Sequence, residues 1–121
     1  MIKIKLETNI TEEDLTDILE TALYDGIWYW IEDRNYSKKA HEDKSRAEQI
    51  MQDKCLLYVD VDMGDDIETK TISRATLIRG YRRYCEKRIK EGRSIPNVCE
   101  IDSVEADIII QLGLFNEIIF G

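Results

Sequence analysis

Alternation of apolar and polar residues at the start of the chain predicts a half-buried strand. In residues 2–6, isoleucine or leucine alternates with lysine, which would place the apolar side chains on one face of a sheet. A helical pattern follows. Thr11 is a typical N-cap, three acidic residues come directly after it, and apolar residues recur at helical spacing up to Gly26. Glycine tolerates the left-handed conformation in which many helices end, so we expect the helix to stop there.

The middle of the chain contains three further strand patterns around a long polar segment. The aromatic and β-branched run at 27–31 predicts a short strand. Residues 34–54 are strongly polar and are compatible with a solvated helix over about 38–51 or with a mobile excursion. Residues 55–62 and 67–72 alternate again and flank a turn at 63–66, which together predict a hairpin.

Two helices and a short strand are predicted for the last third. Ser73 is a suitable cap for a helix running to about Gly92, and Asp102 with Glu105 three residues later resembles a capping box. The helix after Asp102 is apolar nearly all round, which is typical of a helix enclosed in a core. Asn116 is a credible left-handed cap, and residues 117–120 read as a final strand.

The order of elements predicts a single α+β domain spanning residues 1–121, with a small, mostly antiparallel sheet and three or four helices mainly on one face. The apolar share of 43% supports a packed core. The N-terminus lacks the pattern of a secretory signal, no apolar stretch is long enough to span a bilayer, and the cysteine count is odd without paired spacing. We therefore expect a cytoplasmic protein that does not bind membranes.

No catalytic constellation is visible. His41 is the only histidine, and it lies in a polar stretch without a second metal ligand or a nucleophile nearby. The run from Asp60 to Asp66 resembles a calcium loop, but its glycine comes one position early and no closing glutamate follows. We interpret it as outward strand residues followed by an acidic turn. The sequence predicts no catalytic residue, no metal and no cofactor.

Charge is unevenly distributed along the chain. The net charge is −8, yet residues 74–93 contain eight basic and two acidic residues, so this segment carries about +6 and the remainder about −14. Arg88 falls within the apolar arc of this helix, where it needs a carboxylate partner or an exit to solvent; Asp107 is one candidate partner. The opposite face of the helix holds Arg79, Arg82, Arg83, Lys87 and Lys90.

This basic helix has three readings. It is an ordinary amphipathic helix with a solvated face, or it binds the phosphates of a nucleotide or nucleic acid, or it is incidental and the acidic body docks on a basic partner. The aromatic run has two readings. On an alternating strand Trp28 and Trp30 would share a face, either filling the core or anchoring a partner.

Two stretches of the chain resemble a known family. Residues 10–30 contain a threonine, an acidic turn, an amphipathic helix, a glycine and an aromatic block, and residues 106–121 contain alanine-aspartate, glutamine and leucine-phenylalanine. These blocks, about a third of the chain, resemble small proteins of bacteriophages, prophages and plasmids. The chain departs from that pattern at Tyr24, Asp25, Asn116 and Phe120. The resemblance implies a mobile-element accessory protein in the cytoplasm of a bacterial host, a class that includes anti-CRISPR inhibitors.

The leading hypothesis is therefore a non-enzymatic inhibitor that occupies a basic, nucleic-acid-binding surface of a host defence protein, such as a Cas9-type nuclease. An alternative is sequestration of a phosphorylated signalling ligand or nucleotide by helix 74–92, which is also the only segment expected to touch nucleic acid directly. A further alternative is an accessory enzyme of phage DNA metabolism. A homodimer is compatible with the sequence. The candidate contact residues of the leading hypothesis are Trp28, Trp30, Asp60, Asp62, Asp65, Asp66 and Glu68.

Overall fold

The computed structural model describes residues 10–121 and has the α+β architecture that the sequence predicts. The predicted strand at 2–6 lies outside the described residues. In chain order the elements are α1 (Glu12–Asp25), the 3-10 helix η1 (Trp28–Trp30), β1 (Asp33–Tyr36), α2 (Arg46–Gln52), β2 (Leu57–Asp62), β3 (Ile67–Ile72), α3 (Arg74–Lys90), the 3-10 helix η2 (Val98–Glu100) and α4 (Ser103–Phe115).

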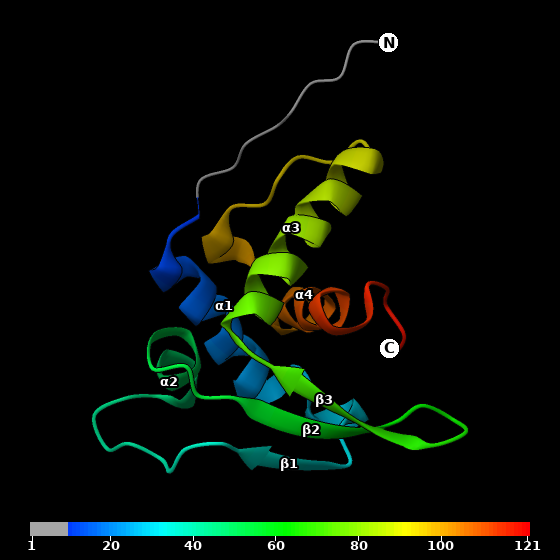
Figure 1. Cartoon of the computed structure of the whole chain (residues 1–121). Coiled ribbons are helices and arrows are strands. Elements are labelled where there is room, and N and C mark those ends of the chain that lie inside the picture. Colours follow the sequence, from blue (N-terminus) through cyan, green and yellow to red (C-terminus); the bar gives the residue numbers. More distant parts are fainter. Residues whose placement is uncertain (1–9) are drawn as a thin grey trace.

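The three strands form one antiparallel sheet in the order β1-β2-β3. The four α-helices lie on the same side of this sheet (Figure 1). The inner face is apolar because alternate residues of β2 point toward the helices: Leu57, Val59 and Val61 are completely buried. The predicted hairpin is confirmed, and so is the placement of the helices on one face.

The helix ends follow the predicted capping chemistry with one exception. Thr11 forms a capping box with Asp14, Asp102 accepts a hydrogen bond from the backbone N–H of Glu105, and Asn116 is left-handed at φ 61°. Gly26 is the exception, since its φ of −99° is right-handed. It is needed for space instead, because a Cβ there would lie 3.1 Å from the carbonyl oxygen of Ser103.

α4 is the central helix, packed against both α1 and α3. Ile109 and Ile110 are completely buried, as expected of a helix that is apolar nearly all round. The contact with α3 is unusually close. A Cβ added at Gly80 would lie 2.1 Å from the carbonyl oxygen of Ile109, and one at Gly113 would lie 2.3 Å from that of Thr76. Two glycines therefore let the backbones of α3 and α4 approach each other directly.

Two predicted strands are wrong. Residues 28–30 form the turn of η1, where the Ile31 N–H bonds back to the Trp28 carbonyl. Ile27 and Trp30, three residues apart, are both buried, which a strand of alternating faces would not allow. Residues 117–120 are not a strand either. The N–H groups of residues 119 and 120 bond to the side chain of Gln111 rather than to another strand.

The polar segment 34–54 contributes to the fold more than predicted. It begins in β1, which pairs with β2, and ends in α2, which is shorter than the predicted helix. Ser45 caps α2 through a capping box with Glu48. Ala47, Ile50 and Met51, at helical spacing, are buried against the rest of the core.

Candidate functional site

The outer face of the sheet is acidic and carries no helix (Figure 1). The strand register places Asp60 and Asp62 of β2 on this face together with Asp33 of β1, which lies directly opposite Asp60. The outward positions of the described strands include no lysine or arginine. Carboxylates directly opposite one another on a sheet repel and destabilise it, so the fold gains nothing from this arrangement.

The acidic surface continues around the hairpin turn. Gly64, at φ 98°, supplies the positive φ that the tight turn requires. Asp65 and Asp66 are exposed beside it. Glu68 of β3 is also exposed, but it lies opposite the inward-facing Val61 and so belongs to the other face of the sheet, with its Oε1 4.0 Å from the ammonium of Lys70. We call the outer carboxylates of the sheet and turn the acidic face: Asp33, Asp60, Asp62, Asp65 and Asp66.

Hydrogen bonds hold several of these carboxylates in place without neutralising them. Asp60 accepts from the Thr69 hydroxyl at 2.7 Å, Asp62 from the backbone N–H of Gly64 at 2.9 Å and Asp66 from that of Ile67 at 2.8 Å. None of the donors is charged. The acidic face is thus an ordered set of anionic acceptors, each with lone pairs left for a partner.

The predicted aromatic anchors do not belong to this surface. Trp30 is only 6% exposed and stacks on Phe120, with ring centroids 5.4 Å apart. Trp28 is half-buried, donates its indole N–H to the Leu23 carbonyl and lies beneath the guanidinium of Arg34. Trp30 is therefore a core residue, and the prediction that it contacts a partner is wrong.

A buried polar network that sequence reasoning missed surrounds Trp30. The carboxylate of Asp107 accepts hydrogen bonds from the Trp30 indole at 2.8 Å, the Tyr29 hydroxyl at 2.5 Å and the Gln111 amide at 3.0 Å. Burial of the hydroxyl, followed by its hydrogen bond to Asp107, raises the pKa of Tyr29 to about 12, although the residue as a whole is 62% exposed.

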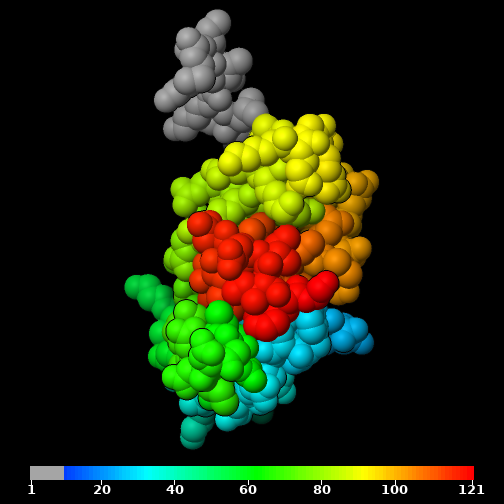
Figure 2. All heavy atoms as spheres, turned by 90° about the vertical axis from the view of Figure 1, so that its right-hand side faces the viewer, coloured from blue at the N-terminus to red at the C-terminus, as the bar shows by residue number. Residues whose placement is uncertain are grey.

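Gln111 extends this network to the end of the chain. Its Oε1 accepts from the backbone N–H groups of residues 119 and 120, each at 2.9 Å. The C-terminal segment is thereby held on the surface between α3 and the hairpin (Figure 2). Every hydrogen-bonding partner of Asp107 serves to hold the fold together, so we assign this carboxylate a structural role.

The basic helix α3 uses part of its charge inside the molecule. Arg79 donates to the carbonyl of Gly113 and Arg83 to that of Leu112, at 2.6 Å for Arg83. Both guanidinium groups thus cap the C-terminal end of α4, where the helix dipole is negative. Arg82 and Lys90 are exposed and form no ion pair with any residue in 10–121, whereas Lys87 pairs with Glu91.

The candidate pairing of Arg88 with Asp107 is wrong. The Arg88 guanidinium donates to the Tyr84 hydroxyl and the Ser94 carbonyl and lies 4.0 Å from a carboxylate oxygen of Glu105. Asp107 lies only two residues after Glu105, which places it about 200° further round α4, and it bonds to Tyr29 and Trp30 instead. The remaining charge of α3 is therefore concentrated at its outer surface.

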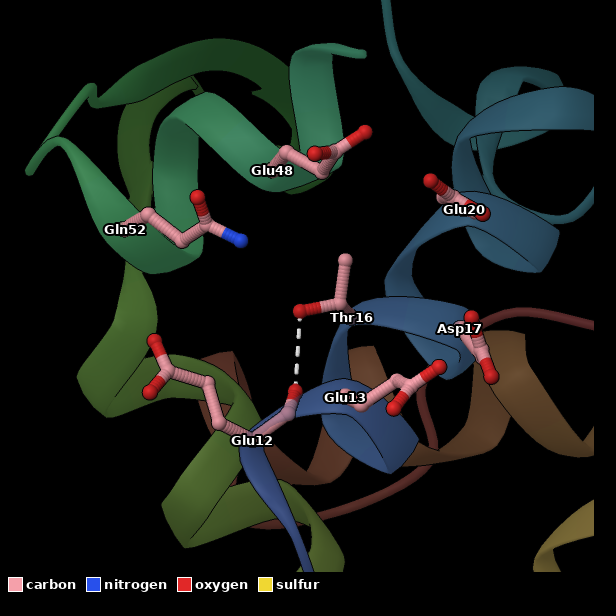
Figure 3. Close-up of a pocket in the computed structure, with 7 residues that line it drawn as sticks. All are labelled: Glu12, Glu13, Thr16, Asp17, Glu20, Glu48 and Gln52. Carbon is pink, nitrogen blue, oxygen red and sulfur yellow. Dashed lines mark hydrogen bonds between the residues drawn. The ribbon is translucent and has the colours of Figure 1, made fainter. Parts of the chain in front are cut away.

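A second acidic surface lies between α1 and α2 (Figure 3). It is an open hollow of about 470 Å³. Thr16 turns its hydroxyl back to the carbonyl of Glu12, so the rim of the hollow is mostly carboxylate. The helical spacing of the acidic residues on α1 could have indicated one wall, but the bounds of α2 were not predicted. The lining residues are Glu12, Glu13, Thr16, Asp17, Glu20, Glu48 and Gln52.

Other reactive side chains offer no site. His41 is exposed and accepts from the backbone N–H of Asp43. Cys55 and Cys85 are buried, and burial raises the pKa of the Cys85 thiol; Cys99 is exposed. Among residues 10–121, no three metal-binding side chains gather closely enough to hold an ion, and no helix is long and apolar enough to cross a membrane.

Comparison with known proteins gives no relative. No protein-family model, no curated protein and no solved structure matches the chain. The functional argument therefore rests on the surface chemistry described above.

Proposed function

We propose that this protein is a non-enzymatic inhibitor that uses its acidic face to occupy a basic, nucleic-acid-binding surface of another protein. A host defence nuclease of the Cas9 kind is the candidate target, because the end blocks of the sequence resemble proteins of mobile elements. The acidic face carries the proposal: it gathers five carboxylates on one uncovered sheet face and its turn, without a basic side chain at the outward strand positions.

The chemistry of this face suits such a target. A channel that binds nucleic acid presents lysine and arginine side chains to phosphates. Carboxylates fixed on a rigid sheet offer the same charge and acceptor oxygens, and arginine binds both groups in a bidentate manner. Opposite fields also accelerate association, which favours an inhibitor that must reach the channel before nucleic acid does.

The alternative of capturing a phosphorylated ligand on α3 has less support. Two of its five proposed ligand-binding residues, Arg79 and Arg83, donate to α4 carbonyls, and Lys87 pairs with Glu91. A ligand would have to compete with these contacts for donors. An accessory enzyme has no candidate site in residues 10–121, because the one well-buried carboxylate network serves the fold.

The test compares two triple variants with the same change of charge. The first replaces Asp60, Asp62 and Asp65 with asparagine, which keeps the hydrogen-bond acceptors of the strand and turn. The matched control replaces Glu13 and Glu20 with glutamine and Asp17 with asparagine, on the hollow between α1 and α2. Both proteins are tested in pull-down and DNA-cleavage assays with purified Cas9-type nucleases.

We expect wild type and the control to inhibit cleavage. The sheet variant should bind about 3- to 150-fold more weakly, because each of the three exposed ion pairs it loses contributes about 0.2–1 kcal/mol. Raising the salt concentration should weaken binding of the wild type. Equal losses for the two variants would show that total charge matters and the acidic face does not. Absence of binding and inhibition by the wild type would refute the proposal for those nucleases.

A further inference from the structure

The edge of the sheet at β3 is open. Residues 67–71 are exposed or half-buried, and β2 is the only strand paired with β3 among the described residues. An edge strand presents a row of unused backbone groups that can pair with another strand. The direction in which these groups point follows from the hairpin register.

Backbone groups at alternate positions of β3 point away from β2. The Met63 N–H donates to the Asp66 carbonyl across the turn, so these two residues form a hydrogen-bonded pair. Hydrogen-bonded pairs alternate along an antiparallel ladder. The backbone groups of residues 68, 70 and 72 therefore face β2, and those of residues 67, 69 and 71 face outward. Two local contacts agree: the Ile67 N–H bonds to the side chain of Asp66, and the Thr71 carbonyl accepts from the Thr76 hydroxyl. By the same alternation, the N–H and C=O of Thr69 point away from β2.

The side chains of β3 are complementary to themselves in one antiparallel register. If Thr69 lies opposite Thr69 of a second copy, Glu68 of each copy lies opposite Lys70 of the other. The same register brings together outward-facing backbone groups, since Thr69 pairs with Thr69 and Ile67 with Thr71. Ile67, which is 58% exposed, would also have part of its side chain covered by Thr71 of the second copy.

We propose that two copies of this chain pair through β3 about a two-fold axis at Thr69, which joins their sheets into one of six strands. The other edge strand does not offer this fit. β1 has only four residues, Asp33–Tyr36. If two copies of β1 paired antiparallel over their whole length, Asp33 would lie opposite Tyr36 and Arg34 opposite Asn35, so no oppositely charged side chains would meet. In the β3 dimer the acidic faces of the two copies form one continuous surface.

Sedimentation velocity over a range of protein concentrations tests the dimer, with charge reversals testing its register. Wild type should associate reversibly with increasing concentration. Glu68→Lys places two lysines opposite two lysines, and Lys70→Glu places glutamates opposite glutamates, so each variant should dimerise at least about tenfold more weakly. The double variant E68K/K70E should recover association. An equimolar mixture of the two single variants should form a heterodimer, because their charges are again opposite.

Each of these results bears on the proposal directly. A wild type that stays monomeric at every concentration would overturn the proposal. Association that E68K leaves unchanged would refute the register. Thr69→Pro gives an independent check, because it removes an N–H that points away from β2 and should abolish association while the hairpin's own ladder stays intact. Inhibition of a nuclease is a separate readout, so failure here leaves the proposed function to its own test.

Discussion

The contact between α3 and α4 makes Gly80→Ala an informative substitution. The new Cβ would lie 2.1 Å from the carbonyl oxygen of Ile109 and 3.0 Å from its carbonyl carbon. Carbon and oxygen atoms approach to about 3.3 Å even in weak hydrogen bonds, so the helix backbones would have to separate by roughly 1 Å. A side chain can rotate out of a clash, whereas the carbonyl of a buried helix cannot.

Two opposing terms set the expected stability. Overpacking of this kind costs about 1–3 kcal/mol, and a clash with backbone belongs at the upper end. Alanine is favoured over glycine inside a helix by about 1 kcal/mol, which works in the other direction. We therefore expect Gly80→Ala to lower the free energy of unfolding by about 2 kcal/mol. Separation of the helices would also lengthen the bonds from Arg79 and Arg83 to the α4 carbonyls.

Urea unfolding followed by circular dichroism measures this effect. Ala75→Gly is the matched control, because Ala75 is exposed on the same helix and its loss of about 1 kcal/mol reports helix propensity alone. If Gly80→Ala proves as stable as the wild type or more stable, propensity dominates, and the close approach of α3 and α4 is wrong.

Two further predictions concern polar contacts. In urea unfolding, Arg83→Met should lower the free energy of unfolding by about 1–2 kcal/mol, because it removes a charged donor from the Leu112 carbonyl. Arg82→Met, on the exposed face, should change it by less than about 0.5 kcal/mol. Equal effects of the two substitutions would contradict the capping role of Arg83. Tyr29 has a folded-state pKa of about 12, above the value near 10 of an unfolded chain, so its contribution to stability is complete below pH 10 and is lost as the pH rises through 12. The absorbance titration of wild type minus that of Tyr29→Phe should therefore show one phenol ionising near pH 12, and a difference centred at pH 10 would disprove the contact with Asp107.

Local signals predicted the helices well because the ends of those helices are set by local chemistry. Thr11 and Asp102 cap the helices they precede, and Asn116 is left-handed. The strand prediction for residues 27–31 is wrong because of a long-range contact. Aromatic and β-branched residues favour strands, but the indole of Trp30 bonds to Asp107, 77 residues away, and that contact overrides a weak propensity.

The candidate site was predicted in part for the same reason. The outward positions of Asp60 and Asp62 follow from alternation along a single strand. Asp33, which completes the acidic face, depends on β1, and the four polar residues of β1 have no apolar alternation to reveal them. The internal use of Arg79 and Arg83 depends on where α4 ends relative to α3, which no pattern within either helix encodes.

Residues 10–30 and 106–121, the two end blocks of the sequence analysis, meet each other in the fold. Tyr29 and Trp30 of the first block bond to Asp107 of the second, and Gln111 holds the tail whose Phe120 stacks on Trp30. These residues of the two blocks are therefore explained by what they do for packing. The acidic face comes from residues 33–66, which the resemblance does not cover. Because folds carry different functions through different surfaces, a protein that shares only the end blocks is expected to share this scaffold, and its partner must be inferred from its own sheet face.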